Sequence, residues 1–161
     1  MPNYFWGFFG LLIMLAILIV MVRVAGTRLR AAKSLLSKLH YIIPEGFDVM
    51  TKQADAVLMQ GINMSLDLRV ANVPSDVAFK VYLLDMLAAL ELPYDGLEMP
   101  EGAAFPGWNA LSQQEELPNL FVLYKQIEED WVYVLMASDA ENYTSGTVAA
   151  RKLADSVVFT D

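Results

Sequence analysis

The chain has no cysteine and only one histidine, His40, among its 161 residues. Without cysteine it can form no disulfide, no thiolate nucleophile and no cysteine-ligated zinc or iron–sulfur site. A single histidine leaves too few groups for the usual nucleophile–base pairs and transition-metal ligand sets. No glycine-rich phosphate loop or nucleophile elbow occurs either. We therefore predict no catalytic site, no cofactor and no metal, with scattered carboxylates as the only groups left for such chemistry.

Charge is also missing from the first 22 residues, which form the longest apolar run of the chain. The stretch 4–22 is long enough to cross the ~30 Å hydrocarbon core as a helix at ~1.5 Å per residue. A cleaved signal peptide is the main alternative, but it normally begins with a positively charged region, which is absent here. We predict a transmembrane anchor over residues 1–24. Aromatic rings mark one boundary and the first charge marks the other, giving the anchor residues Tyr4, Trp6, Phe9, Val22 and Arg23.

Basic residues follow this run, and none precedes it. Five of the eleven Lys and Arg side chains fall before residue 41, where there is no acid: Arg23, Arg28, Arg30, Lys33 and Lys38. Positive charge near a span is retained on the cytoplasmic side, which predicts an N-terminus outside and a C-terminal domain in the cytoplasm. The simple anchor and the lack of sorting motifs favour a bacterial inner (plasma) membrane.

From Tyr41 onward the balance reverses, because six basic side chains face all nineteen acids, leaving this part at a net charge of −13. Nonspecific binding to DNA or RNA depends on Lys and Arg that neutralise phosphates. Nucleic acid is therefore excluded as an expected partner, and the lipid bilayer is retained as one.

Residues 25–43 predict a basic juxtamembrane helix that ends before Pro44. Apolar residues recur in it at three- and four-residue spacing, and Leu29, Leu36 and Leu39 are the candidate partner-binding residues of this seam. The same spacing suits a short coiled coil, which would allow self-association, and an amphipathic helix lying on anionic headgroups. The sequence leaves both interpretations open.

Residues 44–161 predict one acidic α+β domain, a small antiparallel sheet with two main helices packed against one side. Alternation over Met64–Val70 is typical of a half-buried strand, and the runs 120–124 and 131–136 flank Glu128–Asp130 as a hairpin with an acidic tip. A short strand at 47–50 and a helix at 52–60 closed by Gly61 complete this part.

Two main helices are expected. One begins at Ser75, whose hydroxyl can cap free backbone amides, and runs to about Glu91. It is apolar around nearly its whole circumference, so either the core or a partner should cover it. The last helix spans 146–156.

Residues 93–119 hold four of the seven prolines and predict an irregular excursion, within which Ser112 could cap a short helix. Two aromatic rings, Phe105 and Trp108, lie among its turn residues. Loop aromatics often bind partners, so both are partner-binding candidates. The alternative, which we favour, is that they fold back to plug the core.

These features predict a single-pass, membrane-anchored accessory or assembly subunit of a membrane protein complex, which acts through contacts with other membrane-complex proteins. One alternative is a membrane-tethered domain that senses a ligand or cation. Another is an enzyme that works through carboxylates brought together by folding.

Overall fold

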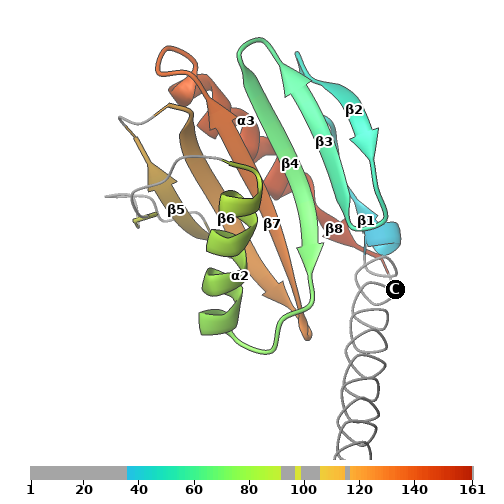
Figure 1. Ribbon diagram of the computed structural model, residues 1–161. Helices are drawn as coiled ribbons and strands as arrows, with labels where there is room; N and C mark the ends of the chain where they lie inside the picture. The colour runs from blue at the N-terminus through green and yellow to red at the C-terminus, as the bar shows by residue number, and fades with distance from the viewer. Residues whose placement is uncertain (1–35, 92–96, 99–105, 115–116, 161) are drawn as a thin grey trace, which may run out of the picture.

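The computed structural model describes residues 36–91, 97–98, 106–114 and 117–160 (Figure 1). Its centre is a six-stranded antiparallel sheet of order β2-β3-β4-β7-β6-β5. The strands are β2 (Asp48–Lys52), β3 (Ala56–Gly61), β4 (Met64–Ala71), β5 (Asn109–Gln113), β6 (Asn119–Ile127) and β7 (Asp130–Ser138). Two short strands, β1 (Leu39–His40) and β8 (Val158–Phe159), pair separately. The helices are α2 (Asp76–Ala89) and α3 (Tyr143–Ser156), which confirms the predicted α+β class.

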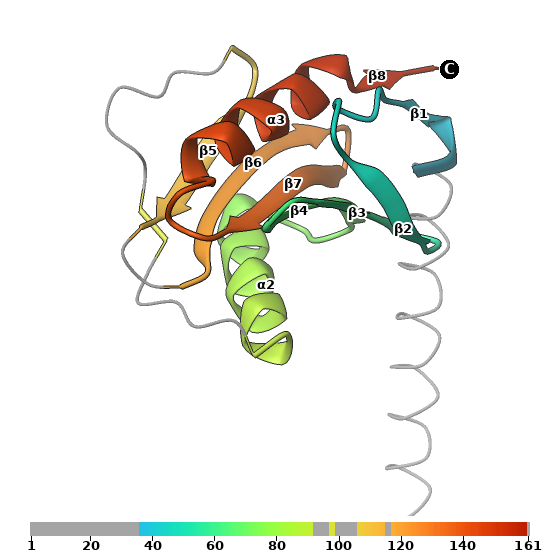
Figure 2. The same cartoon turned by 90° about the horizontal axis from the view of Figure 1, so that it is seen from above.

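The two helices cover opposite faces of the sheet (Figure 2). The prediction that both pack against one side is therefore wrong. The reason lies in β6, where every residue from Asn119 to Tyr124 is buried, and in the equally buried Trp131–Met136 of β7. A strand that is apolar on both faces needs cover on both.

Helix α2 begins as expected, with Oγ of Ser75 accepting a hydrogen bond of 3.1 Å from the amide of Ala78. Its buried stripe is Phe79, Leu83 and Leu87, spaced four residues apart. The Phe79 ring stacks on Trp131 with centroids 4.9 Å apart, so aromatic rings fill the space between helix and sheet. The core therefore covers one side of α2, and the opposite side exposes residues such as Val81.

Helix α3 packs on the other face through Ala149, Ala150 and Leu153. It begins three residues earlier than predicted. The backbone amide of Asn142 donates to Oδ1 of Asp139 at 2.8 Å, which fixes the turn that leads into the helix.

The strand at Met64–Val70 is confirmed as β4, and the predicted acidic hairpin is β6–β7 with Glu128 at positive φ in its turn. The strand expected at 47–50 is β2, which runs from Asp48 to Lys52. The predicted helix 52–60 is wrong, since Ala56–Gly61 pairs along its whole length with β4.

The short helix expected at Ser112 is also wrong. Ser112 lies in the edge strand β5, paired with Phe121, and its backbone exchanges two hydrogen bonds with Glu98. Pairing on both sides holds this segment extended and leaves no free backbone for a helix.

The juxtamembrane helix predicted over 25–43 ends earlier than expected. Leu36–Lys38 are helical, but Leu39–His40 form β1, because the C-terminal strand β8 supplies partners: Leu39 pairs with Phe159 and His40 with Val158. The predicted anchor, residues 1–24, lies outside the described residues. Within the described ranges, no helix is both long and apolar enough to cross a membrane.

Candidate functional site

The ends of three strands meet at one end of the sheet, which we call the β3–β4 end. The register pairs Met64 of β4 with Ser138 of β7, and Ser138 with Asn119 of β6. The turn between β3 and β4, the start of β6 and the end of β7 therefore lie together, as Figure 1 shows.

An open concavity of about 500 Å³ occupies this end. Most of its described lining is apolar or uncharged: Met64, Leu117, Pro118, Ala137, Asn63 and Ser138. A second concavity of about 450 Å³, next to the start of α3, shares Leu117 and includes Tyr143. Leu117 therefore stands between two hollows of the surface.

Two large aliphatic side chains protrude here. Leu117 is 64% exposed, and Ile62, in the β3–β4 turn, is 79% exposed. Solvation of aliphatic surface is unfavourable, and a fully buried Ile or Leu side chain gains about 1.5–3 kcal/mol. Exposed aliphatics beside an apolar hollow are typical of an interaction surface.

The sheet also holds a buried polar cluster on its α2 side. Oδ2 of Asp67 accepts a hydrogen bond of 2.6 Å from Nε of Arg69, while Oδ1 of Asp67 is buried without a hydrogen-bond partner. The hydroxyls of Tyr133 and Tyr82 lie 3.3 Å apart and share a hydrogen bond. Burial raises the pKa of the Asp67 carboxyl, and Arg69 only partly offsets that rise.

Burial also raises the pKa of Tyr133 well above its ordinary value, and the neighbouring Tyr82 adds to the rise. This phenol therefore stays protonated and can serve as a hydrogen-bond donor. Within the described ranges, no group of three or more His, Asp or Glu side chains is placed so that it could hold a metal ion.

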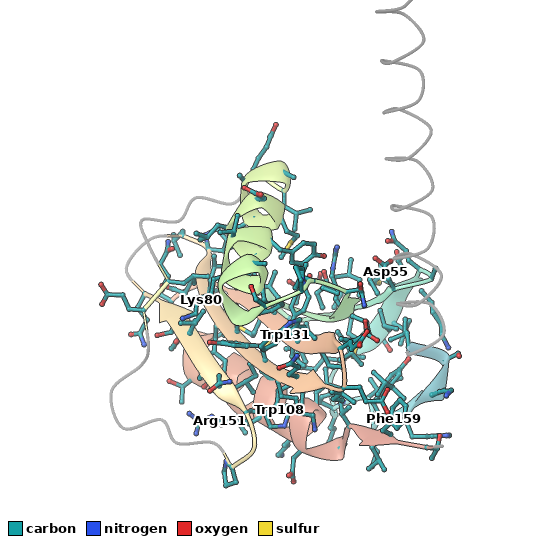
Figure 3. All side chains as sticks on the ribbon, turned by 90° about the horizontal axis from the view of Figure 1, so that it is seen from below. Asp55, Lys80, Trp108, Trp131, Arg151 and Phe159 are labelled. Atoms are coloured by element: carbon teal, nitrogen blue, oxygen red, sulfur yellow. The ribbon has the colours of Figure 1, made fainter. Side chains whose placement is uncertain are left out.

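The candidate residues predicted from the sequence lie in different parts of the structure. Leu36 and Leu39 are buried in the domain core. Trp108 is also buried in the core on the α3 side, whereas Trp131 lies on the α2 side (Figure 3). The Nζ atom of Lys125 lies 4.6 Å from the centroid of the Trp108 ring. The plug interpretation is thereby confirmed for Trp108.

The remaining candidates lie outside the described residues: Tyr4, Trp6, Phe9, Val22, Arg23, Leu29 and Phe105. Sequence reasoning missed Ile62 and Leu117. The sequence feature that could have identified them is an aliphatic residue next to residues that favour turns. Ile62 lies between Gly61 and Asn63, and Leu117 precedes Pro118. Nothing local shows that the two meet at one end.

No protein-family model matches this chain, and no curated protein sequence matches it. Among solved structures, the fold is similar to the solution structure of cyanobacterial PsbP (CyanoP) from Synechocystis sp. PCC 6803. The TM-score is 0.50 at 9% sequence identity, over 78% of this chain and 88% of that one. At this identity the likeness concerns the fold alone.

Proposed function

We propose that this chain is a single-pass, membrane-anchored accessory or assembly subunit of a membrane protein complex, and that it binds its partner through the β3–β4 end. The observation that carries the proposal is the pair of exposed aliphatics, Ile62 and Leu117, beside an open apolar concavity. The anchor itself rests on the sequence, from the uncharged run and the basic residues after it.

The position of this surface suits a protein partner. Leu36 and Leu39 lie in one depression with Lys52 and Gln53, at the β2–β3 turn. That turn is at the opposite end of β3 from Ile62 (Figure 1). A domain attached to the bilayer on the Leu36 side would direct Ile62 and Leu117 away from it, toward another protein.

Charge indicates what kind of partner fits. The one charged residue in its described lining is acidic, Asp139, and a second acid, Glu141, follows two residues later in the chain. We expect a partner surface with apolar side chains flanked by Lys or Arg, because such a surface complements both features.

A sensor function is the second candidate, and one observation favours it. Oδ1 of Asp67 is buried and unpartnered, which is unusual because most buried polar atoms have a hydrogen-bond partner. A small cation or a proton could satisfy this atom. A thermal-shift screen of the full chain with divalent cations tests the idea, since a ligand that binds the folded state must raise its apparent stability. Unchanged stability with every cation would leave the proton as the remaining candidate.

The main proposal is tested by purifying the tagged full chain from its native membranes in mild detergent. We expect a stoichiometric companion with the wild type, and its loss from the variant with both Ile62→Asp and Leu117→Asp. Val148→Asp is the matched control, because Val148 is an exposed aliphatic on α3 that lines neither concavity. A companion that survives the double substitution, or a wild-type chain recovered alone, would refute binding through this end.

A further inference from the structure

The first residues of the described domain are hydrogen-bonded to the C-terminal residues of the chain. Beyond the pairing of β1 with β8, the backbone N–H and Oγ1 of Thr160 both donate to the carbonyl of Lys38, at 3.1 and 3.0 Å. The backbone N–H of Ile42 donates to Oγ of Ser156 at 2.9 Å, across 114 positions of sequence. We call this region, Lys38–Ile43 with Ser156–Thr160, the β1–β8 corner.

The corner is fixed to the body of the domain. Leu36, Leu39 and Val157 belong to the core cluster that α3 shares with the sheet. The described chain therefore enters the domain, at Leu36, at a position that the fold fixes.

The corner exposes aliphatic side chains next to basic ones. Ile42 is 72% exposed and Val158 is 56% exposed, and Ile43 is also exposed. The exposed side chains of Lys38 and His40 lie on the same segment. Three acids flank it in the sequence: Glu45, just after Pro44, Asp155, just before Ser156, and Asp161, just after Thr160.

We propose that the β1–β8 corner rests on the headgroup region of the bilayer, with Ile42, Ile43 and Val158 at the lipid interface. The inference rests on the anchor in the proposed function. Thirteen residues separate Val22, the last of the uncharged run, from Leu36, which lies two residues before the corner. As an upright helix they would lift the corner by about 20 Å, whereas along the surface they keep it at headgroup level.

Charge and burial both favour the surface arrangement. A domain of net charge −13 is repelled by anionic headgroups, so it should approach them where the five basic residues of 23–38 join it. In addition, Leu36 and Leu39 point into the core and cannot extend a coiled-coil seam to this point. Of the two interpretations of the juxtamembrane segment, this favours the helix on the membrane surface.

The absence of cysteine permits a direct test in the full chain, because any introduced cysteine is the only one to react. Ile42→Cys and Val158→Cys report on the corner, and Ile62→Cys and Leu117→Cys are matched controls of similar exposure at the β3–β4 end. Each variant is labelled with a small fluorophore and reconstituted in vesicles of phosphatidylcholine and phosphatidylglycerol, with and without a headgroup-attached nitroxide quencher. Circular dichroism checks that each variant is folded.

We expect the nitroxide lipid to cause a large loss of fluorescence at positions 42 and 158 and little loss at 62 and 117. Equal quenching at both ends, or stronger quenching at 62 and 117, overturns the inference. Flotation of the same samples separates this failure from failure of the anchor. A chain that floats with unquenched corner labels refutes only the corner contact, while a chain that stays at the bottom of the gradient refutes the anchor as well.

Discussion

Arg69 and Asp67 lie two residues apart on the same face of β4, with Nε of Arg69 2.6 Å from Oδ2 of Asp67. The guanidinium satisfies one carboxylate oxygen, while the other is buried without a partner. Taking a carboxylate out of water costs more than this one ion pair returns, which is why the pKa of Asp67 is raised and not lowered.

Asp67 should therefore make the domain less stable as pH rises. A carboxyl whose pKa is raised in the folded state binds its proton more tightly there than in the unfolded chain, where the pKa has its ordinary value of 3.8. The stability gained from this tighter proton binding is fully present below about that pH. It is lost as the pH rises through the raised pKa of the folded state. Asp67→Asn, which stays neutral, should lose less stability over this window than the wild type.

Urea unfolding of the detergent-solubilised chain at a series of pH values, followed by tryptophan fluorescence, measures this difference. Asp85→Asn, at an exposed position on α2, is the control and should follow the wild-type profile. Parallel profiles for Asp67→Asn and the wild type would show that this carboxyl does not bind a proton differently on folding.

Gly146 in α3 is predicted to reject even a methyl group. A Cβ atom there would lie 2.6 Å from Sδ of Met136, a side chain that is completely buried. Gly146→Ala gains up to about 1 kcal/mol of helix propensity but should lose about 1–3 kcal/mol to overpacking, for a net loss.

The Met136→Ala background removes the obstacle, so there the same Gly146→Ala substitution should become neutral or stabilising. A double-mutant cycle by urea unfolding measures the coupling. Additive effects of the two substitutions would mean that α3 and β7 do not pack as closely as described.

Trp108 should act in folding and not in partner binding. Removing its buried ring leaves a cavity, and Trp108→Ala should cost about 3–5 kcal/mol. Lys125→Met, which removes only the cation above the ring, should cost about 0.5–1 kcal/mol. Chemical denaturation of both variants checks the order. A Trp108→Ala chain as stable as the wild type that no longer co-purifies with its companion would restore the partner-binding interpretation.

Substitutions at the β3–β4 end should behave in the opposite way. Ile62→Asp and Leu117→Asp each replace an exposed side chain, so each should change unfolding free energy by no more than about 0.5 kcal/mol. A thermal melt of each variant is the measurement. A loss of several kcal/mol would show that these side chains support the fold, and would remove them as free contact residues.

Much of the sheet could be predicted because its signals are local. Strand β4 alternates apolar and polar side chains, and the β6–β7 hairpin joins two apolar runs by an acidic turn. Strand β3 was missed because Ala, Leu, Met and Gln favour helices as isolated residues. Pairing with β4 overrides that preference.

The features that place the candidate surfaces are not local. Leu39 meets Phe159 across most of the chain, and Leu117 joins the β3–β4 turn only through the register of β4, β7 and β6. The periodicity of a single segment cannot predict such a contact between distant parts of the chain. The apolar run of β6 does indicate that both faces of the sheet are covered, because apolar and polar side chains do not alternate along it.

Sided labelling of Val148→Cys in intact cells tests the anchor and its orientation most directly, because Val148 is exposed and lies outside both proposed contact surfaces. The chain should sediment with membranes and resist extraction by high salt, and a membrane-impermeant maleimide should label position 148 only after the cells are broken. Labelling of position 148 from outside intact cells, or recovery of the chain in the soluble fraction without detergent, would contradict a cytoplasmic domain held by a single N-terminal span.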